Sequence, residues 1–368
     1  MNKKLIAVPM VIILFLLTTA TPILADGGFF PDSMYRDLYE VAQKAVILYG
    51  NSTGNYTEHL ILSVSFEGDA EDFAWVIPVP NKPEIAVTDP ELFWELSDFT
   101  RTEIPPEHGF GCFGGAAPGD QDGVDVIEEQ VVGPYATAIL SSTNATALAD
   151  WLNANGYIFP EDGETIISEY IEKEWYFVAT KINAIEEGTG EALAEGAIEP
   201  IVLSFASNET VYPLRISSLS TTTATPPEVL LYVFADQVMV PEQYPLYIGY
   251  GNWEDNAFTL EYGDKVSIED LLENDCHTLA GLILDLGYVP IYSLGYEFYL
   301  SKLRGSISAD QMVDIQMVSY EEGDSLDSLA ESNGNSGDIV VLATIVGPVC
   351  GLYLRRRYRR TTIWRGPA

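Results

Sequence analysis

Three acidic residues stand beside an apolar run in the stretch GDAEDFAWVIPVP, residues 68–80. Asp69, Glu71 and Asp72 offer the hard carboxylate oxygens that Ca²⁺ takes as ligands. The alternating Asp-x-Asp-x-Asp-Gly loop of a dedicated calcium site is absent from this stretch. The trio is therefore a candidate calcium site, and the alternative is a turn at Gly68 that leaves the three acids in water.

Two cysteines, Cys112 and Cys276, lie between the apolar ends of the chain. In an oxidising exterior they are expected to form one disulfide that closes a long loop. A zinc site is the alternative, because His108 precedes Cys112 by four residues and His277 follows Cys276 directly. Adjacent Cys and His are poorly spaced for chelation, which favours the disulfide. The third histidine, His59, lies in a predicted strand and is expected to be structural.

Two further kinds of surface site are indicated. Trp253 lies in GYGNWEDN, where small and polar neighbours favour a ligand-binding role, such as stacking on a sugar, over core packing. Four Asn-x-Ser/Thr sequons without a central proline are acceptors for N-glycosylation if the chain is exported. These acceptors are Asn51, Asn55, Asn144 and Asn208.

The sequence lacks the common catalytic motifs. No Gly-x-Ser-x-Gly elbow, His-Glu-x-x-His pair or Walker loop occurs, and the Gly-rich stretch 102–123 carries no lysine after its glycines. No cofactor is expected beyond the candidate calcium. Carboxylates are numerous, and a glycosidase-type mechanism needs only two of them in one cleft. A carboxylate-dependent surface hydrolase acting on polysaccharide or peptide therefore stays open as the alternative to a non-catalytic protein.

Both ends of the chain carry targeting signals. Residues 1–25 combine two lysines, an apolar run and a small-residue end, which is typical of a secretory signal peptide. Residues 339–354 are uncharged and are followed at once by arginines, which predicts a transmembrane helix with residues 355–368 in the cytoplasm. Residues 320–338 are acidic and rich in Gly and Ser, so they are expected to form a flexible stalk.

The charge balance restricts the partners. Eight of the 18 Lys and Arg lie in the terminal segments, which leaves ten for residues 26–337 against 54 of the 55 Asp and Glu, a formal charge of −44. A polyanion repels nucleic acid and anionic lipid. Cations, basic surface proteins or glycans stay possible partners, and a repulsive, solvated surface is the plainest interpretation.

Strands and helices mix along residues 26–319 without regular alternation, which predicts an α+β fold with largely antiparallel sheets. Helices are expected at 89–101, 144–155, 164–174 and 267–286. The run 58–66 is expected to turn at Gly68 and pair with Phe73–Val79 as a hairpin. The Thr- and Pro-rich segment 220–227 is a possible sub-boundary between two domains. Strands are expected at 58–66, 73–79, 124–131, 134–140, 175–182, 200–205, 211–219, 229–235 and 288–303.

The stretch GDAEDFAWVIPVP resembles the hallmark of a prokaryotic domain-of-unknown-function family, number 2330 in its series. The likeness extends over about residues 27–317 and includes VGPYATAIL (132–140), ADWLNANGY (149–157), EYIEKEWYFVATKI (169–182), VYPLRISS (211–218), EVLLYVFAD (228–236) and FYLSKLRGSISADQM (298–312). The resemblance implies a secreted or membrane-anchored protein of undetermined activity, and it supplies no catalytic residues. Members commonly flank the Gly-Gly-Phe-Phe opening with cysteines, whereas Asp26 and Pro31 stand there in this chain.

Taken together, these features predict a single-pass protein of the cell membrane with a large, acidic, glycosylated extracellular domain. A binding or structural role is expected rather than catalysis.

Overall fold

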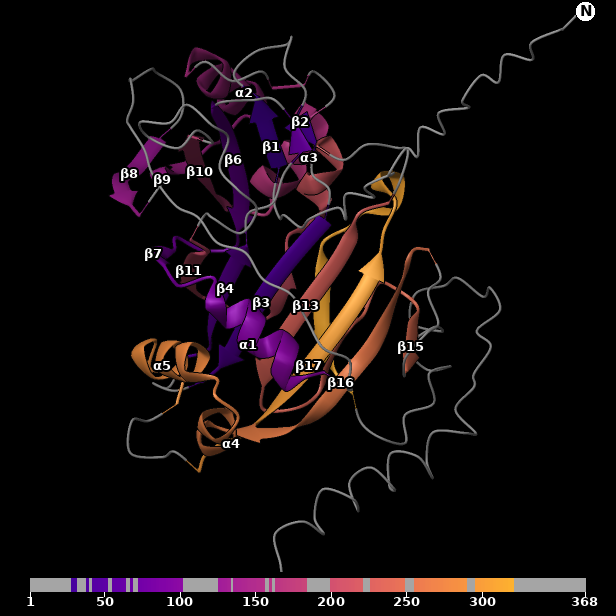
Figure 1. Cartoon of the computed structure of the whole chain (residues 1–368). Helices are drawn as coiled ribbons and strands as arrows, with labels where there is room; N and C mark the ends of the chain where they lie inside the picture. The colour runs from indigo at the N-terminus through magenta and orange to yellow at the C-terminus, as the bar shows by residue number, and fades with distance from the viewer. Residues whose placement is uncertain are drawn as a thin grey trace, which may run out of the picture.

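The structure is a computed structural model of the whole chain (Figure 1). The residues that it describes are 28–31, 38–39, 42–51, 55–63, 67–68, 72–101, 125–133, 135–155, 159–160, 163–183, 199–220, 226–248, 255–289 and 295–320. The predicted α+β class is confirmed: several helices pack on sheets that are mostly antiparallel.

A five-stranded antiparallel sheet occupies the upper part of Figure 1, in the order β1-β6-β10-β9-β8. Strand β6 lies inside this sheet because it is apolar on both faces: Trp75 packs into one core cluster and Val76 into another. The predicted strands 73–79, 124–131, 134–140 and 175–182 are confirmed in this sheet. Its strands are Gly28–Pro31 (β1), Asp72–Val79 (β6), Asp125–Val132 (β8), Tyr135–Ser141 (β9) and Tyr176–Asn183 (β10).

Two predicted helices cover one face of this sheet. Helix α2 (Ala145–Ala154) begins where the Asn144 side chain accepts a hydrogen bond from the Ala147 amide, the cap that the sequence predicts. Helix α3 (Gly163–Glu172) packs beside it. Leu148 and Leu152, both fully buried, join the two helices to the Val76 face of the sheet.

The larger sheet has eight strands in the order β15-β16-β17-β13-β3-β4-β11-β7. Two of its strand pairs are parallel, β13 with β3 and β15 with β16. The other pairs of this sheet are antiparallel, which agrees with the expectation of largely antiparallel sheets. The strands are Ala42–Gly50 (β3), Thr57–Ser63 (β4), Glu84–Val87 (β7), Ile201–Ala206 (β11), Glu228–Ala235 (β13), Leu246–Ile248 (β15), Ala257–Ser267 (β16) and Glu297–Ser306 (β17).

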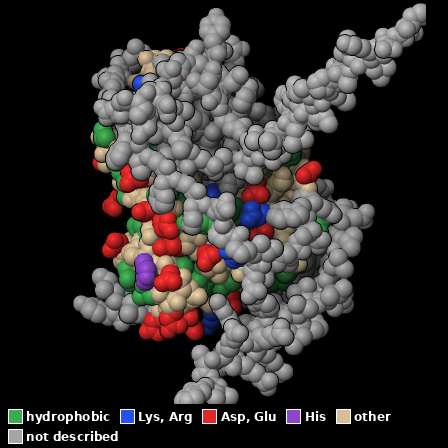
Figure 2. All heavy atoms as spheres, viewed as in Figure 1, with side chains coloured by type: hydrophobic (Ala, Val, Ile, Leu, Met, Phe, Trp, Pro, Cys, Tyr) green, Lys and Arg blue, Asp and Glu red, His purple; other side chains and the backbone are tan. Residues whose placement is uncertain are grey.

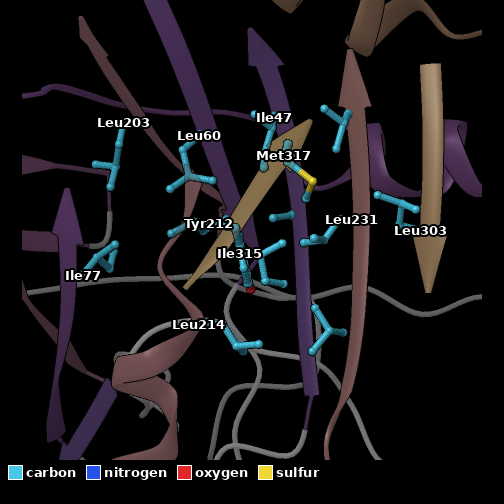
Figure 3. Close-up of a cluster of buried hydrophobic side chains, with 14 of the residues drawn as sticks. Ile47, Leu60, Ile77, Leu203, Tyr212, Leu214, Leu231, Leu303, Ile315 and Met317 are labelled. Atoms are coloured by element: carbon cyan, nitrogen blue, oxygen red, sulfur yellow. The ribbon is translucent and has the colours of Figure 1, made fainter. Parts of the chain in front are cut away.

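Each face of the large sheet is covered by a different layer. Helices α1 (Glu91–Phe99), α4 (Ile268–Glu273) and α5 (His277–Asp285) cover one face (Figure 1). A three-stranded sheet covers the other face and consists of β12 (Thr210–Tyr212), β14 (Met239–Pro241) and β18 (Ile315–Ser319). Figure 3 shows Ile315 and Met317 of this small sheet beside Ile47, Leu60 and Leu231 of the large one.

The expected hairpin between 58–66 and 73–79 is wrong. Strand β4 belongs to the large sheet, whereas β6 pairs with β1 and β10 in the five-stranded sheet. Strand β5 (Glu67–Gly68) lies between them along the chain and pairs with β2 (Leu38–Tyr39) in a short two-stranded sheet. The chain therefore crosses from one sheet to the other near Gly68, because each of the two apolar strands finds partners that are distant in sequence.

Three other expectations need correction. Among its described residues, the run 288–303 is a strand only from Glu297, since Tyr288 and Val289 are not in a strand. The run 211–219 is a strand only as far as Tyr212, after which Leu214–Leu219 forms a 3₁₀ helix, since Pro213 cannot donate to a ladder. The single helix expected at 267–286 is two helices, separated where Asp275 adopts a left-handed φ of 61°. Leu272 consequently leaves the apolar face and is 38% exposed.

The described part of the chain has no helix that is long and apolar enough to cross a membrane. The predicted spanning segment 339–354, the signal peptide 1–25 and the tail 355–368 lie outside the described residues. So does the predicted stalk 320–338 except for Tyr320, which packs against the core and donates its backbone amide to the Val238 carbonyl. Those predictions therefore stay predictions. The same is true of the sub-boundary at 220–227, because residues 221–225 are not described.

Candidate functional site

Several of the predicted site residues lie outside the described part of the chain. Asp69, Glu71, Cys112 and Trp253 are not described, and Asp72 is described only as the first backbone position of β6. The calcium site, the disulfide and the ligand-binding tryptophan therefore stay predictions. Among the described residues, no three His, Cys, Asp or Glu side chains come together as a possible metal site.

The four predicted glycosylation acceptors are described, and all are exposed. Asn51 and Asn55 lie between β3 and β4, Asn208 lies between β11 and β12, and Asn144 caps α2. Exposure is necessary for modification, so the positions are compatible with the prediction.

Cys276 is buried at the start of α5, with its Sγ 3.6 Å from the carbonyl oxygen of Asn274 and 3.7 Å from that of Glu95. Burial, followed by the nearby carboxylates of Glu95, Asp98 and Asp275, raises the pKa of the thiol to about 12. Cys276 is therefore a neutral thiol at physiological pH, and this disfavours both nucleophilic attack and metal ligation through its sulfur.

His59 is structural, as predicted. It is buried in β4, and its Nδ1 lies 2.8 Å from the hydroxyl of Ser204 on the neighbouring strand β11. Burial lowers the pKa of the imidazole to about 4, so the ring is neutral at physiological pH.

The most site-like group of side chains is one that the sequence did not indicate. Four charged residues meet on the helix-covered face of the large sheet, and we call them the charged cluster. Lys302 Nζ lies 3.1 Å from Glu261 Oε2, and Arg304 Nε lies 2.8 Å from Glu261 Oε1. Arg304 also donates through Nη1 to Glu228 Oε1. The cluster consists of Glu228, Glu261, Lys302 and Arg304.

A β-bulge gives Glu261 its direction. Leu260 is opposite Leu303 and Tyr262 is opposite Lys302, so Glu261 has no cross-strand partner in the β16–β17 ladder. Leu260 packs into the core on one face of the sheet, whereas Tyr262 packs into the core on the helix-covered face. The extra residue at this reversal turns toward Lys302 and Arg304, the kind of re-aiming that bulges provide.

The charged cluster is mostly sealed from water. The side chains of Glu261 and Lys302 are 5% and 8% exposed, whereas Glu228 at the rim is 39% exposed. Burial lowers the pKa of Lys302, although Glu261 opposes this shift by stabilising the charged form. Tyr232 lies beneath, with its ring centroid 5.9 Å from Lys302 Nζ. Figure 2 shows acidic side chains around the few basic ones at the upper end of the large sheet.

A second polar junction ties α3 to the C-terminal part of the described chain. Asp314 accepts hydrogen bonds from the Tyr170 hydroxyl at 2.6 Å and the Arg215 backbone amide at 3.2 Å. Lys173 Nζ lies 3.1 Å from the other oxygen of this carboxylate. All three donors point at one carboxylate that is 12% exposed, so the junction acts as a structural brace.

Glu58 is the third inward carboxyl group. It is 0% exposed, and its Oε2 accepts a hydrogen bond from the Val211 backbone amide at 3.1 Å. Burial raises its pKa to about 8, and the hydrogen bond from Val211 opposes this shift only in part. The strand pattern contained the signal for this position, since Glu58 has the same parity along β4 as the buried Leu60 and Leu62.

Chemically, these three arrangements pair carboxylates with donors or bury them in the core. Two acids share one guanidinium in the charged cluster, three donors contact Asp314, and Glu58 has no contact with solvent. A general acid and base pair needs access to a substrate and to water.

Among the comparisons with known proteins, a family model identifies the family. The model of a family described as an uncharacterized protein conserved in bacteria, DUF2330, matches residues 27–285. No curated protein matches. One solved structure, the crystal structure of baculovirus P35, is similar at 10% identity and a TM-score of 0.36 over 80% of this chain and 100% of that chain, too low to carry an argument. Since the family model covers well over half of the 368 residues, the chain belongs to the DUF2330 family of uncharacterized proteins conserved in bacteria.

Proposed function

We propose that this chain is a single-pass cell-surface protein whose acidic exterior binds or organises other molecules and does not convert them. The support is the sequence of the two ends: an export signal at 1–25, and an apolar run at 339–354 followed by arginines. On this proposal residues 26–319 form an extracellular domain, residues 320–338 form its stalk, and residues 355–368 lie in the cytoplasm.

The proposal that the protein is not catalytic rests on one observation: the carboxyl groups that point inward are paired or buried. Glu261 is paired with Lys302 and Arg304, and Asp314 accepts from three donors. Glu58 is sealed from solvent. A hydrolase built on two carboxylates needs a pair that a substrate can reach, and these three groups form no such pair among the described residues.

The charge supports the choice of partners. A formal charge of −44 over residues 26–337 attracts cations and basic surface proteins and repels nucleic acid. Figure 2 shows acidic side chains gathered over α4. The same proposal includes three sites: calcium at Asp69, Glu71 and Asp72, a glycan on Trp253, and a disulfide between Cys112 and Cys276.

Membrane fractionation with protease treatment of intact cells tests the topology. The full chain, tagged at its C-terminus, is expected to stay in membranes after a high-salt wash and to leave them only with detergent. Protease added outside the cells should remove the domain and spare the tag. The matched control is Val346→Arg, because a charge at the centre of a span costs about 2.5–3.5 kcal/mol on insertion scales. Recovery of the unmodified chain in the cytosol would contradict the proposal.

An activity screen tests the absence of turnover. The detergent-solubilised full chain is incubated with peptide and polysaccharide libraries, beside Glu228→Gln as the matched variant. Glu228 is chosen because its carboxylate is the most exposed of the charged cluster. Turnover by the unmodified chain that Glu228→Gln abolishes would establish the hydrolase alternative and overturn the proposal.

A further inference from the structure

Glu58 lies between two sheets, where an ionised carboxylate has no compensation. Residues of even number in β4 point toward the three-stranded sheet, and Leu60 and Leu62 lie in the apolar core that the two sheets share. Glu58 has the same orientation and is 0% exposed. Figure 3 shows Tyr212 of β12 projecting into this layer close to Leu60.

One hydrogen bond joins Glu58 to the small sheet. The Val211 amide of β12 donates to Oε2, while Oε1 has no hydrogen-bond partner among the described residues. The hydroxyl of Thr210, one residue earlier in β12, is also buried without a partner in that part of the chain. Thr210 and Tyr212 alternate with Val211, so both project to the side of β12 from which Glu58 approaches.

No described basic side chain faces Glu58: Lys44 of β3 lies on the other face of the large sheet, with its Nζ 5.6 Å from the centroid of the Phe93 ring. The cross-strand neighbours of Glu58 are Tyr49 on β3 and Phe205 on β11. His59 lies on the opposite face of β4, where it contacts Ser204. Met317 of β18 is opposite Thr210. The pKa of Tyr49, the titratable cross-strand neighbour, is raised by burial and by Tyr56, Glu58 and Glu209, none of which is basic.

The burial of Glu58 and the lack of a partner for its Oε1 among the described residues determine which protonation state the closed arrangement favours. A neutral carboxyl group costs far less to bury than a carboxylate, so the closed arrangement of the two sheets favours the protonated form of Glu58. The same carboxyl group in water titrates near its ordinary value of 4.5, whereas in the closed arrangement its pKa is about 8. Between pH 4.5 and about 8, separation of the three-stranded sheet from the large sheet therefore releases a proton from Glu58.

We propose that Glu58 is a proton-dependent clasp: in its neutral form it holds β12, and with it the three-stranded sheet, against the large sheet, and loss of its proton frees that sheet to open. The sign follows from linkage. Below pH 4.5 both forms are protonated and opening is independent of pH. Between 4.5 and about 8 the closed form binds the extra proton, so the opening equilibrium increases about tenfold per pH unit.

Hydrogen exchange of the full chain tests this clasp. Exchange of the Val211 amide and of the β14 and β18 amides is followed from pH 5 to pH 9, after correction for the intrinsic rate of each amide. In the unmodified chain the opening constant is expected to increase about tenfold per unit up to about pH 8 and to level off above it. Amides of helix α2, which packs on the five-stranded sheet, serve as the internal reference.

Two variants make the test specific. Glu58→Gln keeps an oxygen for the Val211 amide but cannot ionise, so its opening constant should not change with pH. Glu209→Gln removes an exposed acid next to β12 and should keep the full tenfold slope. A flat profile in the unmodified chain overturns the proposal, and so does a tenfold slope that persists in Glu58→Gln. If Glu58→Gln does not fold, the profile of the unmodified chain beside that of Glu209→Gln still decides the matter.

Discussion

Substitutions in the charged cluster should change the free energy of unfolding, and the sign of the change depends on whether an unpaired buried charge remains. Lys302 Nζ lies 3.1 Å from Glu261 Oε2, and both side chains are less than a tenth exposed. Glu261→Gln keeps the shape but removes the negative charge between Lys302 and Arg304. Because breaking a buried pair leaves an uncompensated charge, we expect the free energy of unfolding to fall by about 3–5 kcal/mol. At an effective dielectric constant of 20, Coulomb attraction at this distance is about 5 kcal/mol, which is of the same order.

Lys302→Met completes the test in a double-mutant cycle. Alone it should destabilise the protein, because Glu261 loses one of its two cationic partners. In the Glu261→Gln background the same change removes a buried cation that has lost its anion, so it should stabilise the protein. The free energy of unfolding is measured by urea denaturation for the four proteins. An equal cost of Lys302→Met in both backgrounds would show that the ion pair is not coupled and would refute the reasoning.

The pH dependence of the same variants has a defined sign. Burial lowers the pKa of Lys302 below 10.5, and Glu261 opposes the shift. Glu261→Gln should therefore lower this pKa further. Between the folded pKa and 10.5 the unfolded chain binds more protons, so stability rises with pH in that window. The deficit of Glu261→Gln relative to the unmodified chain should shrink as pH increases toward 10.5, and a deficit that grows would contradict the assignment.

Three further predictions concern the scaffold. Gly305→Ala should cost about 1–3 kcal/mol in a urea titration, because the new Cβ would lie 2.8 Å from the Ala257 carbonyl oxygen; Gly281→Ala, with nothing within 4 Å, should instead stabilise α5 by up to about 1 kcal/mol. Asn144→Ala should lower stability by about 1 kcal/mol through loss of the α2 cap, whereas Asn144→Asp should keep the cap while removing the sequon. Glu95→Gln should weaken the two backbone hydrogen bonds at 2.8 Å that hold the start of α5, and faster hydrogen exchange there is the readout.

Each of these scaffold predictions has a contrary result. Equal costs at Gly305 and Gly281 would mean that crowding at the β16–β17 pair is not the cause. Loss of stability in Asn144→Asp as large as in Asn144→Ala would exclude the cap as the cause. Unchanged exchange at the start of α5 in Glu95→Gln would show that this carboxylate does not hold the helix.

Local patterns were enough to predict most of the individual elements. The alternation in β6 and β9, and the Asn cap and Gly stop around α2, are properties of a few consecutive residues. Periodicity and capping act over one or two turns of chain, so they can be recognised in a single sequence. The prediction failed at 211–219 and at 267–286, where Pro213 and the left-handed Asp275 interrupt an otherwise favourable pattern.

The candidate sites were recognised much less well than the elements. The predicted site residues were chosen because acids, cysteines and tryptophans are conspicuous, and several of them lie outside the described residues. The charged cluster was missed because a bulge at Glu261 has no sequence signature, and because its members come from three strands. Glu58 could have been noticed, since an acid stood on the apolar side of a predicted strand.

By itself the sequence determined the family, the acidic character of residues 26–337 and the elements that short-range periodicity specifies. The tertiary structure decided which strands share a sheet, and so separated β4 from β6 although they are neighbours along the chain. It also brought Glu58 to the Val211 amide, 153 residues away, and enclosed it in an apolar layer. Burial and charge compensation depend on contacts between distant segments, and a local pattern does not contain them.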